Sequence, residues 1–308
     1  MKCFNKFSCI IVLLVFFASC KKTEEPSYQT ESEAKAILNL SYGADPKQVM
    51  DVYLPPNRST NTSVIIFVHG GSFIGGDKND FSAHARYLAG SGYAVLNVNY
   101  RLVDASGIFD YPTRHKESQV KVKNQVDDIS AIVDFAISQA RSWVVSGTRI
   151  GIAGHSAGAT LAMLYSYDAR NANKVQAVSN VAGALDLQFT NVANWQYLPA
   201  YILEGGFRYT GFKVEVANEP HYKAISPMFT LNERRLVPTL SFFPEYNNVD
   251  GLPKQDFNTF NKFTSELNKF KVPNELVFLK GADHNLTRVT DWEIALNKTV
   301  AYFNEHIQ

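Results

Sequence analysis

Apolar residues along this chain fall into short, nearly continuous runs separated by longer amphipathic stretches. The runs are rich in Val, Ile, Leu and Phe and lack polar alternation, which predicts strands buried on both faces of a sheet. Strands are predicted at 36–40, 49–54, 63–68, 94–98, 149–153, 175–181, 239–243 and 275–279.

The intervening stretches carry apolar residues at helical spacing. They predict helices at 81–89, 126–140, 157–167, 257–270 and 292–303. Alternation of strands and helices predicts an α/β fold with a mainly parallel central sheet and helices on both faces. The first two strands flank a turn containing Gly43 and Pro46, which predicts an opening hairpin.

The segment 188–236 interrupts this alternation after the strand at 175–181 and has no clear sheet period. It is interpreted as a cap or pocket-covering insertion. Its aromatic residues either line a substrate pocket or form the cap's own small core. They are Phe189, Trp195, Tyr197, Tyr201, Phe207, Tyr209, Phe212 and Tyr222.

The amino-terminal residues have the order of an export signal. Lys2 and Lys6 precede an apolar run at 9–17, which is too short to cross a bilayer as a helix. Residues Phe17-Ala18-Ser19-Cys20 resemble a bacterial lipoprotein signal, with cleavage before Cys20 and lipidation of its thiol. This predicts a membrane-anchored lipoprotein of the cell envelope, on its periplasmic or surface face, with plain secretion as the alternative.

The domain organisation follows from that leader. Residues 1–19 form the signal peptide, 20–34 a flexible polar tether, and 35–308 one folded domain. All cysteines lie in the leader, as Cys3, Cys9 and Cys20, so the domain depends on packing and not on disulfides.

Composition fits a globular protein with a sizeable core. The chain has 308 residues, 45% of them hydrophobic, and a formal net charge of +1. Without a basic block in the body, binding to nucleic acid is not predicted. No cofactor or metal is implied by the residues.

The candidate nucleophile is Ser156 in Gly154-His155-Ser156-Ala157-Gly158. This five-residue pattern follows a predicted strand and opens a predicted helix, which is the strand-turn-helix setting of a nucleophile elbow. The small neighbours permit the tight turn, and the helix amino terminus directs free N–H groups toward developing negative charge.

A glycine-rich loop follows the strand at 63–68. It reads His69-Gly70-Gly71-Ser72-Phe73 and occupies the position expected of an oxyanion loop. The oxyanion hole is assigned to the backbone N–H groups of Gly71, Ser72 and Ala157. His69 is interpreted as a structural residue that shapes this loop.

His284 is the predicted general base, because it lies in a loop after a late strand and the base comes last in this chain order. The acid that orients it is predicted between serine and histidine, and Asp250 is chosen. Glu245 and Asp256 remain alternatives. Two further carboxylates, Asp186 and Asp283, are interpreted as solvated or capping residues.

Taken together, these motifs resemble the α/β-hydrolase carboxylesterases close to the hormone-sensitive lipase-like and kynurenine formamidase-like enzymes, including acetylxylan esterases. The matching stretches are Asp51-Val52-Tyr53-Leu54-Pro55, His69-Gly70-Gly71-Ser72-Phe73, Asn99-Tyr100-Arg101-Leu102, Gly154-His155-Ser156-Ala157-Gly158, Ala184-Leu185-Asp186-Leu187, Ser226-Pro227 and Asp283-His284. The resemblance implies a triad of Ser156, Asp250 and His284, with Tyr100-Arg101 as a structural element beside the pocket.

The expected activity is therefore metal-independent hydrolysis of a carboxylic ester through an acyl-enzyme. Small-molecule or carbohydrate esters are the expected substrates, and export with a membrane anchor fits removal of small acyl groups from carbohydrate. An amidase or peptidase with the same triad, and a non-catalytic binding protein on the same scaffold, are the alternatives.

Overall fold

A computed structural model describes residues 30–231, 237–248 and 255–307. Within them, eight strands form one sheet in the order β10-β9-β8-β7-β5-β6-β3-β2. All pairs are parallel except β2 with β3 and β3 with β6. The strands are β2 (Lys35–Ser41), β3 (Val49–Leu54), β5 (Val64–Val68), β6 (Ala94–Val98), β7 (Ile150–His155), β8 (Ala177–Val181), β9 (Thr239–Tyr246) and β10 (Asn274–Asp283).

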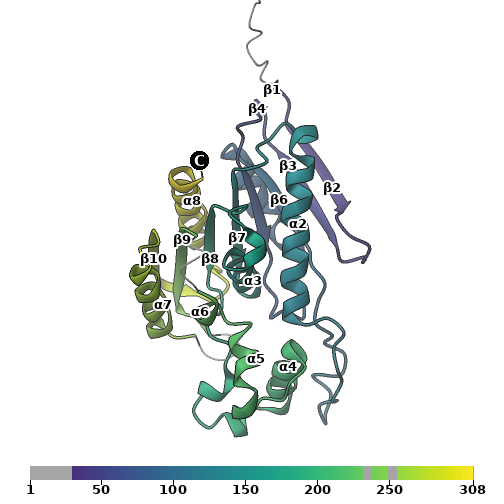
Figure 1. Ribbon diagram of the computed structural model, residues 1–308, viewed down its shortest axis with the longest axis vertical. Coiled ribbons are helices and arrows are strands. Elements are labelled where there is room, and N and C mark those ends of the chain that lie inside the picture. The colour runs from purple at the N-terminus through teal and green to yellow at the C-terminus, as the bar shows by residue number, and fades with distance from the viewer. Residues whose placement is uncertain (1–29, 232–236, 249–254, 308) are drawn as a thin grey trace, which may run out of the picture.

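Helices cover both faces of this sheet (Figure 1). Alternate side chains of β5 show why: Ile66 belongs to the core under α2, α3 and α7, whereas Phe67 belongs to the core under α1 and α8. Such a strand is buried on both faces, so its sequence is continuously apolar. The helices are α1 (Ser82–Gly90), α2 (Val122–Trp143), α3 (Ala157–Ser166), α7 (Phe257–Lys269) and α8 (Val289–His306).

The predicted α/β class, the opening hairpin and the order of these elements are confirmed, although several elements differ in extent. Helix α2 begins at Val122, before the predicted residue 126. Strand β10 runs on to Asp283, because an irregularity after Leu279 lets its end pair again with β9. Gly281 has a positive φ of 71° at this irregularity, a conformation that glycine adopts without steric cost.

The amino-terminal end of the described chain pairs with the domain. Residues of β1 (Thr30–Glu31) run antiparallel to β4 (Arg58–Ser59), and the Arg58 guanidinium donates to the carbonyl of Glu33. The end of the predicted 20–34 tether is thus attached, although 30–34 are exposed and add no core. The leader and Cys20 lie outside the described residues. No helix among the residues described could span a membrane.

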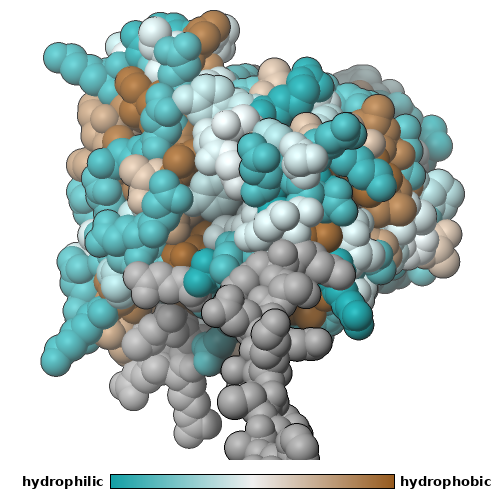
Figure 2. Space-filling model, turned by 90° about the horizontal axis from the view of Figure 1, so that it is seen from above, coloured by the Kyte–Doolittle hydropathy of each residue, from teal (hydrophilic) through white to brown (hydrophobic). Residues whose placement is uncertain are grey.

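The predicted insertion at 188–236 contains helices between β8 and β9. These are α4 (Ala200–Thr210), α5 (Glu219–Lys223) and α6 (Pro227–Thr230), with 3₁₀ turns η3 (Phe189–Asn191), η4 (Trp195–Tyr197) and η5 (Val216–Asn218). Helices α4 and α5 lie beyond the carboxyl ends of the parallel strands (Figure 1). At the opposite end, hydrophilic residues predominate on the surface and apolar ones are interspersed (Figure 2).

The buried aromatic residues of the cap join the core on the α2, α3 and α7 face of the sheet. Phe189 packs against Tyr222 with ring centroids 5.8 Å apart, and both side chains are fully buried with Tyr209 beside them. The buried guanidinium of Arg208 donates to the carbonyls of Asp104, Ser106 and Arg114, which attaches α4 to the body. Phe189, Tyr209 and Tyr222 therefore extend the core of the domain and do not form a separate small core of the cap.

Candidate active site

Ser156 occupies a strained turn between β7 and α3. Its φ of 52° and ψ of −124° are rare for a residue with a side chain. The turn is held because the Ser156 N–H donates to the carbonyl of Val181 at 2.8 Å, on the neighbouring strand. The buried hydroxyl is thereby fixed at the carboxyl edge of the sheet.

Glycines flanking the serine allow the backbones to meet. A Cβ on Gly158 would lie 2.2 Å from the carbonyl oxygen of His69, and one on Gly154 would lie 2.6 Å from the carbonyl carbon of Gly158. Neither space holds a methyl group. The sequence pattern around Ser156 therefore reflects close packing of α3 against the loop after β5.

The structure brings His284 to this serine. Its Nε2 lies 2.9 Å from Ser156 Oγ, although 128 residues separate them in sequence. The ring is on a loop whose backbone is held by a second histidine, because His155 Nε2 donates to the carbonyl of His284 at 2.9 Å. Ser156 Oγ–H can donate to an unprotonated His284 Nε2.

Burial keeps that imidazole neutral. Desolvation and, to a smaller extent, the nearby His155 lower the pKa of His284 to about 3, and Asp283 opposes both effects. Burial also lowers the pKa of His155, and that of His84 to about 4. At neutral pH the base is therefore unprotonated and able to accept a proton.

The other ring nitrogen of His284 contacts an amide. Asn247 Oδ1 lies 2.6 Å from His284 Nδ1, and the asparagine side chain is buried. The predicted acid, Asp250, lies outside the described residues. Asn247 was not predicted, because the third member of the triad was predicted as a carboxylate. Its place in the loop after the strand predicted at 239–243, three residues before Asp250, is the signal that the sequence offers.

The remaining candidate carboxylates have other partners. Glu245 accepts from the N–H of Gly281 at 2.6 Å, which holds the irregular part of β10. Asp256 caps α7 by accepting from Thr259, and Asp283 accepts from the N–H of Thr287. Asp186 accepts from the N–H of Gln188. The first two are thus occupied elsewhere, and the last two act as local turn or capping residues, as expected.

The glycine-rich loop after β5 is tightly wound. Gly71, Ser72 and Phe73 have positive φ angles of 124°, 51° and 66°. No backbone hydrogen bond among the described residues has the N–H of Gly71, Ser72 or Ala157 as its donor. The N–H groups assigned to the oxyanion hole are therefore available to a ligand.

Three side chains from different elements hold this loop. Tyr209 of the cap donates its hydroxyl to the carbonyl of Ser72 at 3.0 Å. Tyr100 donates to the carbonyl of His69 at 2.9 Å and stacks on the His69 ring, whose Nδ1 donates to Gly70. Gln125 of α2 donates to the carbonyl of Phe73 at 2.7 Å. His69 therefore shapes the loop, as predicted.

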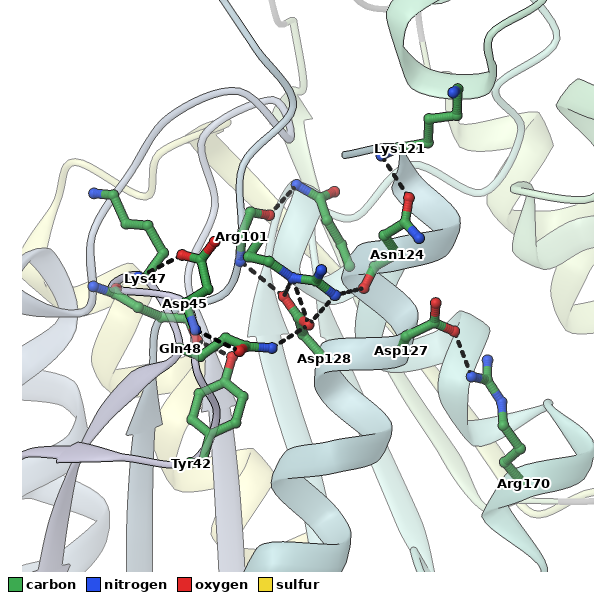
Figure 3. A network of polar contacts seen from close by, with 12 residues as sticks. Tyr42, Asp45, Lys47, Gln48, Arg101, Lys121, Asn124, Asp127, Asp128 and Arg170 are labelled. Carbon is green, nitrogen blue, oxygen red and sulfur yellow. Dashed lines mark hydrogen bonds and ion pairs between the residues drawn. The ribbon is translucent and has the colours of Figure 1, made fainter. Parts of the chain in front are cut away.

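Arg101 extends this support into the body (Figure 3). Its backbone N–H and guanidinium both bind Asp128 of α2, with distances of 2.6 to 3.0 Å. Gln48 also donates to Asp128, and Gln125 donates to the carbonyl of Arg101. The Tyr100-Arg101 motif thus fixes the end of β6 and the loop beside it, as the family resemblance implied.

Ser156 and His284 open onto a cavity of about 370 Å³. The cavity is lined by Gly71 and Ser72 of the glycine-rich loop and by four aromatic rings. These rings belong to Phe81, His84, His155 and Trp292. The rings of His84 and Trp292 meet edge to face at 4.2 Å. Phe81, His84 and Trp292 come from the region around α1 and α8, and His155 ends β7. The sequence did not predict these residues as a pocket wall, because the candidate pocket aromatics were those of the cap.

A larger cavity of about 730 Å³ lies between the cap and helices α2 and α3. Tyr209 and Phe212 line it, whereas Ser156 and His284 do not. No group of three or more metal-ligating side chains occurs within the described ranges.

Comparison with known proteins agrees with this geometry. The BD-FAE family model matches residues 50–197, which contain the glycine-rich loop and Ser156. The chain is 31% identical over 129 residues to a probable isoprenylcysteine alpha-carbonyl methylesterase of Oryza sativa subsp. japonica, covering 42% of this chain and 27% of that protein. It is 27% identical over 148 residues to kynurenine formamidase of Salmo salar, covering 47% of this chain and 44% of that protein. The chain thus spans less than half of each of these relatives.

Solved structures resemble nearly the whole chain. A truncated carbohydrate esterase from gut microbiota has a TM-score of 0.67 at 17% identity, covering 89% of this chain and 97% of the other. A bacterial heroin esterase has a TM-score of 0.66 at 18% identity, covering 90% of this chain and 84% of the other. Esterase 2 of Thermogutta terrifontis has a TM-score of 0.64 at 20% identity, covering 88% of this chain and 92% of the other. The chain therefore has the α/β-hydrolase fold, and its residues 50–197 match the BD-FAE family model.

Proposed function

We propose that this protein is a serine carboxylic ester hydrolase acting through an acyl-enzyme. The observation that carries the proposal is the 2.9 Å contact between Ser156 Oγ and His284 Nε2 beside available backbone N–H groups. A neutral imidazole, a strained serine and oxyanion donors are the groups that acyl transfer requires. The esterase relatives support the same class of reaction.

The reaction follows from these positions. Ser156 Oγ attacks the ester carbonyl carbon while His284 Nε2 takes the hydroxyl proton. The N–H groups of Gly71, Ser72 and Ala157 stabilise the oxyanion. The alcohol leaves with the proton from His284, and water, deprotonated by His284, then attacks the acyl group and releases the acid with Ser156 restored. The predicted third member, Asp250, remains a prediction.

Carbohydrate esters are the proposed substrates within this class. The cavity of about 370 Å³ fits a small acyl group and part of a sugar, and the apolar rings of Phe81 and Trp292 offer faces on which a sugar ring can stack. A structural neighbour described as a carbohydrate esterase supports the choice. A panel of acetylated sugars, feruloylated sugars and longer-chain esters tests it, and preference for long aliphatic chains contradicts it.

Similarity to kynurenine formamidase favours amide hydrolysis as the second candidate. The same serine and histidine can cleave an amide if His284 protonates the leaving nitrogen. Matched aryl acetate and aryl formamide substrates separate the two activities. The ester proposal requires the larger kcat/KM on the ester.

Replacement of the nucleophile tests the proposal directly. Ser156→Ala is expected to abolish hydrolysis of 4-nitrophenyl acetate while leaving the circular dichroism spectrum unchanged. A fluorophosphonate probe is expected to label the unmodified protein at Ser156. Retained turnover in the alanine variant, or a folded protein that resists labelling, contradicts the assignment and favours the binding-protein alternative.

The export and lipidation of Cys20 are proposed from the leader sequence alone. A lipidated protein partitions into the detergent phase of Triton X-114, and Cys20→Ala is expected to shift it to the aqueous phase. Cys3→Ala is the matched control, since its cysteine lies before the apolar run. Equal partitioning of all three proteins contradicts lipidation at Cys20.

A further inference from the structure

The carboxyl ends of the neighbouring strands β9 and β10 bring the side-chain amide of Asn247 beside the imidazole of His284. Tyr246, the last residue of β9, pairs with Asp283, the last residue of β10. Asn247 and His284 are therefore the first residues beyond a paired end, and parallel strands bring such residues to the same edge. Their side chains meet there, with Asn247 Oδ1 2.6 Å from His284 Nδ1.

The direction of this hydrogen bond follows from the chemistry at the other nitrogen. His284 Nε2 accepts from the Ser156 hydroxyl, so a neutral ring carries its proton on Nδ1. That Nδ1–H needs an acceptor, and the side-chain oxygen of Asn247 supplies one. Asn247 is only 6% exposed, so water competes poorly for this position.

We infer that Asn247 is the positioning residue of His284, so that the third place of the triad is held by a neutral amide and not by a carboxylate. This inference rests on the proposed function for its catalytic meaning. The contact fixes the tautomer in which Nε2 faces Ser156, which is the orienting part of the role that an aspartate has in serine hydrolases.

A neutral partner has a further consequence. When His284 takes the serine proton, its Nδ1–H faces a neutral amide dipole, and the adjacent Asp283 carboxylate acts on the ring from the end of β10. Burial already disfavours the charged ring, and Asn247 does not reverse this. Replacing the amide by a carboxylate therefore keeps the acceptor oxygen and adds a charge that stabilises the imidazolium.

The test uses the full chain with three substitutions in one loop. Asn247→Ala is expected to lower kcat on 4-nitrophenyl acetate by about 10- to 100-fold, with KM changed less than threefold. Asn247→Asp is expected to recover most of that loss and to move the acidic limb of the kcat/KM profile upward by at least one pH unit. Asn248→Ala removes an exposed neighbouring amide and is expected to change kcat less than twofold.

A readout independent of turnover accompanies these kinetics. In the Ser156→Ala background, the His284 Nδ1–H is expected to give a slowly exchanging downfield proton resonance, which Asn247→Ala abolishes. The inference about Asn247 can thus be tested even if the protein proves not to be an esterase. Loss of activity in Ser156→Ala concerns the proposed function alone.

Asp250 is the competing candidate for the third place of the triad. The inference is overturned if Asn247→Ala keeps kcat and the downfield resonance while Asp250→Asn loses at least 100-fold in kcat. It is also overturned if Asn247→Asp leaves the acidic limb where it is in the unmodified protein. Loss of kcat in Asn247→Ala, together with recovery and an upward shift of the acidic limb in Asn247→Asp, supports it.

Discussion

The two halves of the site are held by different kinds of contact. Backbone packing at the centre of the sheet holds Ser156, and side-chain contacts at the β9-β10 edge hold His284. At the centre, backbone approaches backbone: Gly154 and Gly158 leave no room for a Cβ, and Ser156 is held by a strand carbonyl. At the edge, side chains meet across long sequence distances, as His284 does with Asn247 and Ser156. Substitution of the glycines at the centre should therefore affect folding, whereas substitution of the side chains at the edge should affect catalysis.

The largest effect is expected for the base. His284→Gln is expected to lower kcat/KM for 4-nitrophenyl acetate on the order of 10⁴-fold, since neither proton transfer nor orientation of Ser156 survives. The midpoint of thermal unfolding should change by only a few degrees because the ring is at the edge of the fold. A large fall in the midpoint of thermal unfolding with only a modest fall in kcat/KM would contradict the assignment of a catalytic role to the edge of the sheet.

Substitution at the centre should act on stability. Gly158→Ala places a methyl group against the carbonyl oxygens of His69 and Val68, and is expected to cost about 3 kcal/mol in the free energy of unfolding. Gly90→Ala is the control, because a Cβ there meets nothing within 4 Å. It is expected to stabilise slightly, by about 0.5 kcal/mol. Urea unfolding measures both, and equal effects would contradict the packing argument.

Acid should weaken the histidine-rich part of the site. Burial lowers the pKa of His84 to about 4 and of His284 to about 3, below that of an unfolded histidine. From about pH 6.5 downward the unfolded chain binds more protons than the native one, so stability falls as pH falls. Thermal unfolding between pH 7 and 5 measures this slope. His84→Asn should make it shallower, and an unchanged slope would contradict a contribution from His84.

The smallest effect is expected where the cap meets the oxyanion loop. Tyr209→Phe removes the hydrogen bond to the Ser72 carbonyl and is expected to lower kcat about threefold to tenfold, with a stability loss of about 1 kcal/mol. Tyr197→Phe, at a tyrosine that is 86% exposed in the cap, is the matched control with no change expected. Equal kinetics in both variants would show that the cap does not support the loop.

Most of the fold followed from the sequence because its signals are local. The strands and helices predicted from hydrophobic runs recur in the structure, since a doubly buried parallel strand such as β5 must be apolar throughout. The extension of β10 did not follow, because the irregularity near Gly281 depends on pairing with β9 and on the bond from Glu245. The aromatic wall of the cavity was missed for a similar reason: Phe81 and Trp292 lie far apart in sequence.

The sequence by itself determined the nucleophile turn, the glycine-rich loop and the α/β class, since each depends on residue size and period over a few positions. Only the tertiary structure decided which side chain faces His284 Nδ1. Glu245, Asn247 and Asp256 are close together in sequence, yet strand pairing directs the first to Gly281 and the second to His284, whereas the third caps its own helix. The register between β9 and β10 made that choice, because it sets which residues pass the sheet edge together.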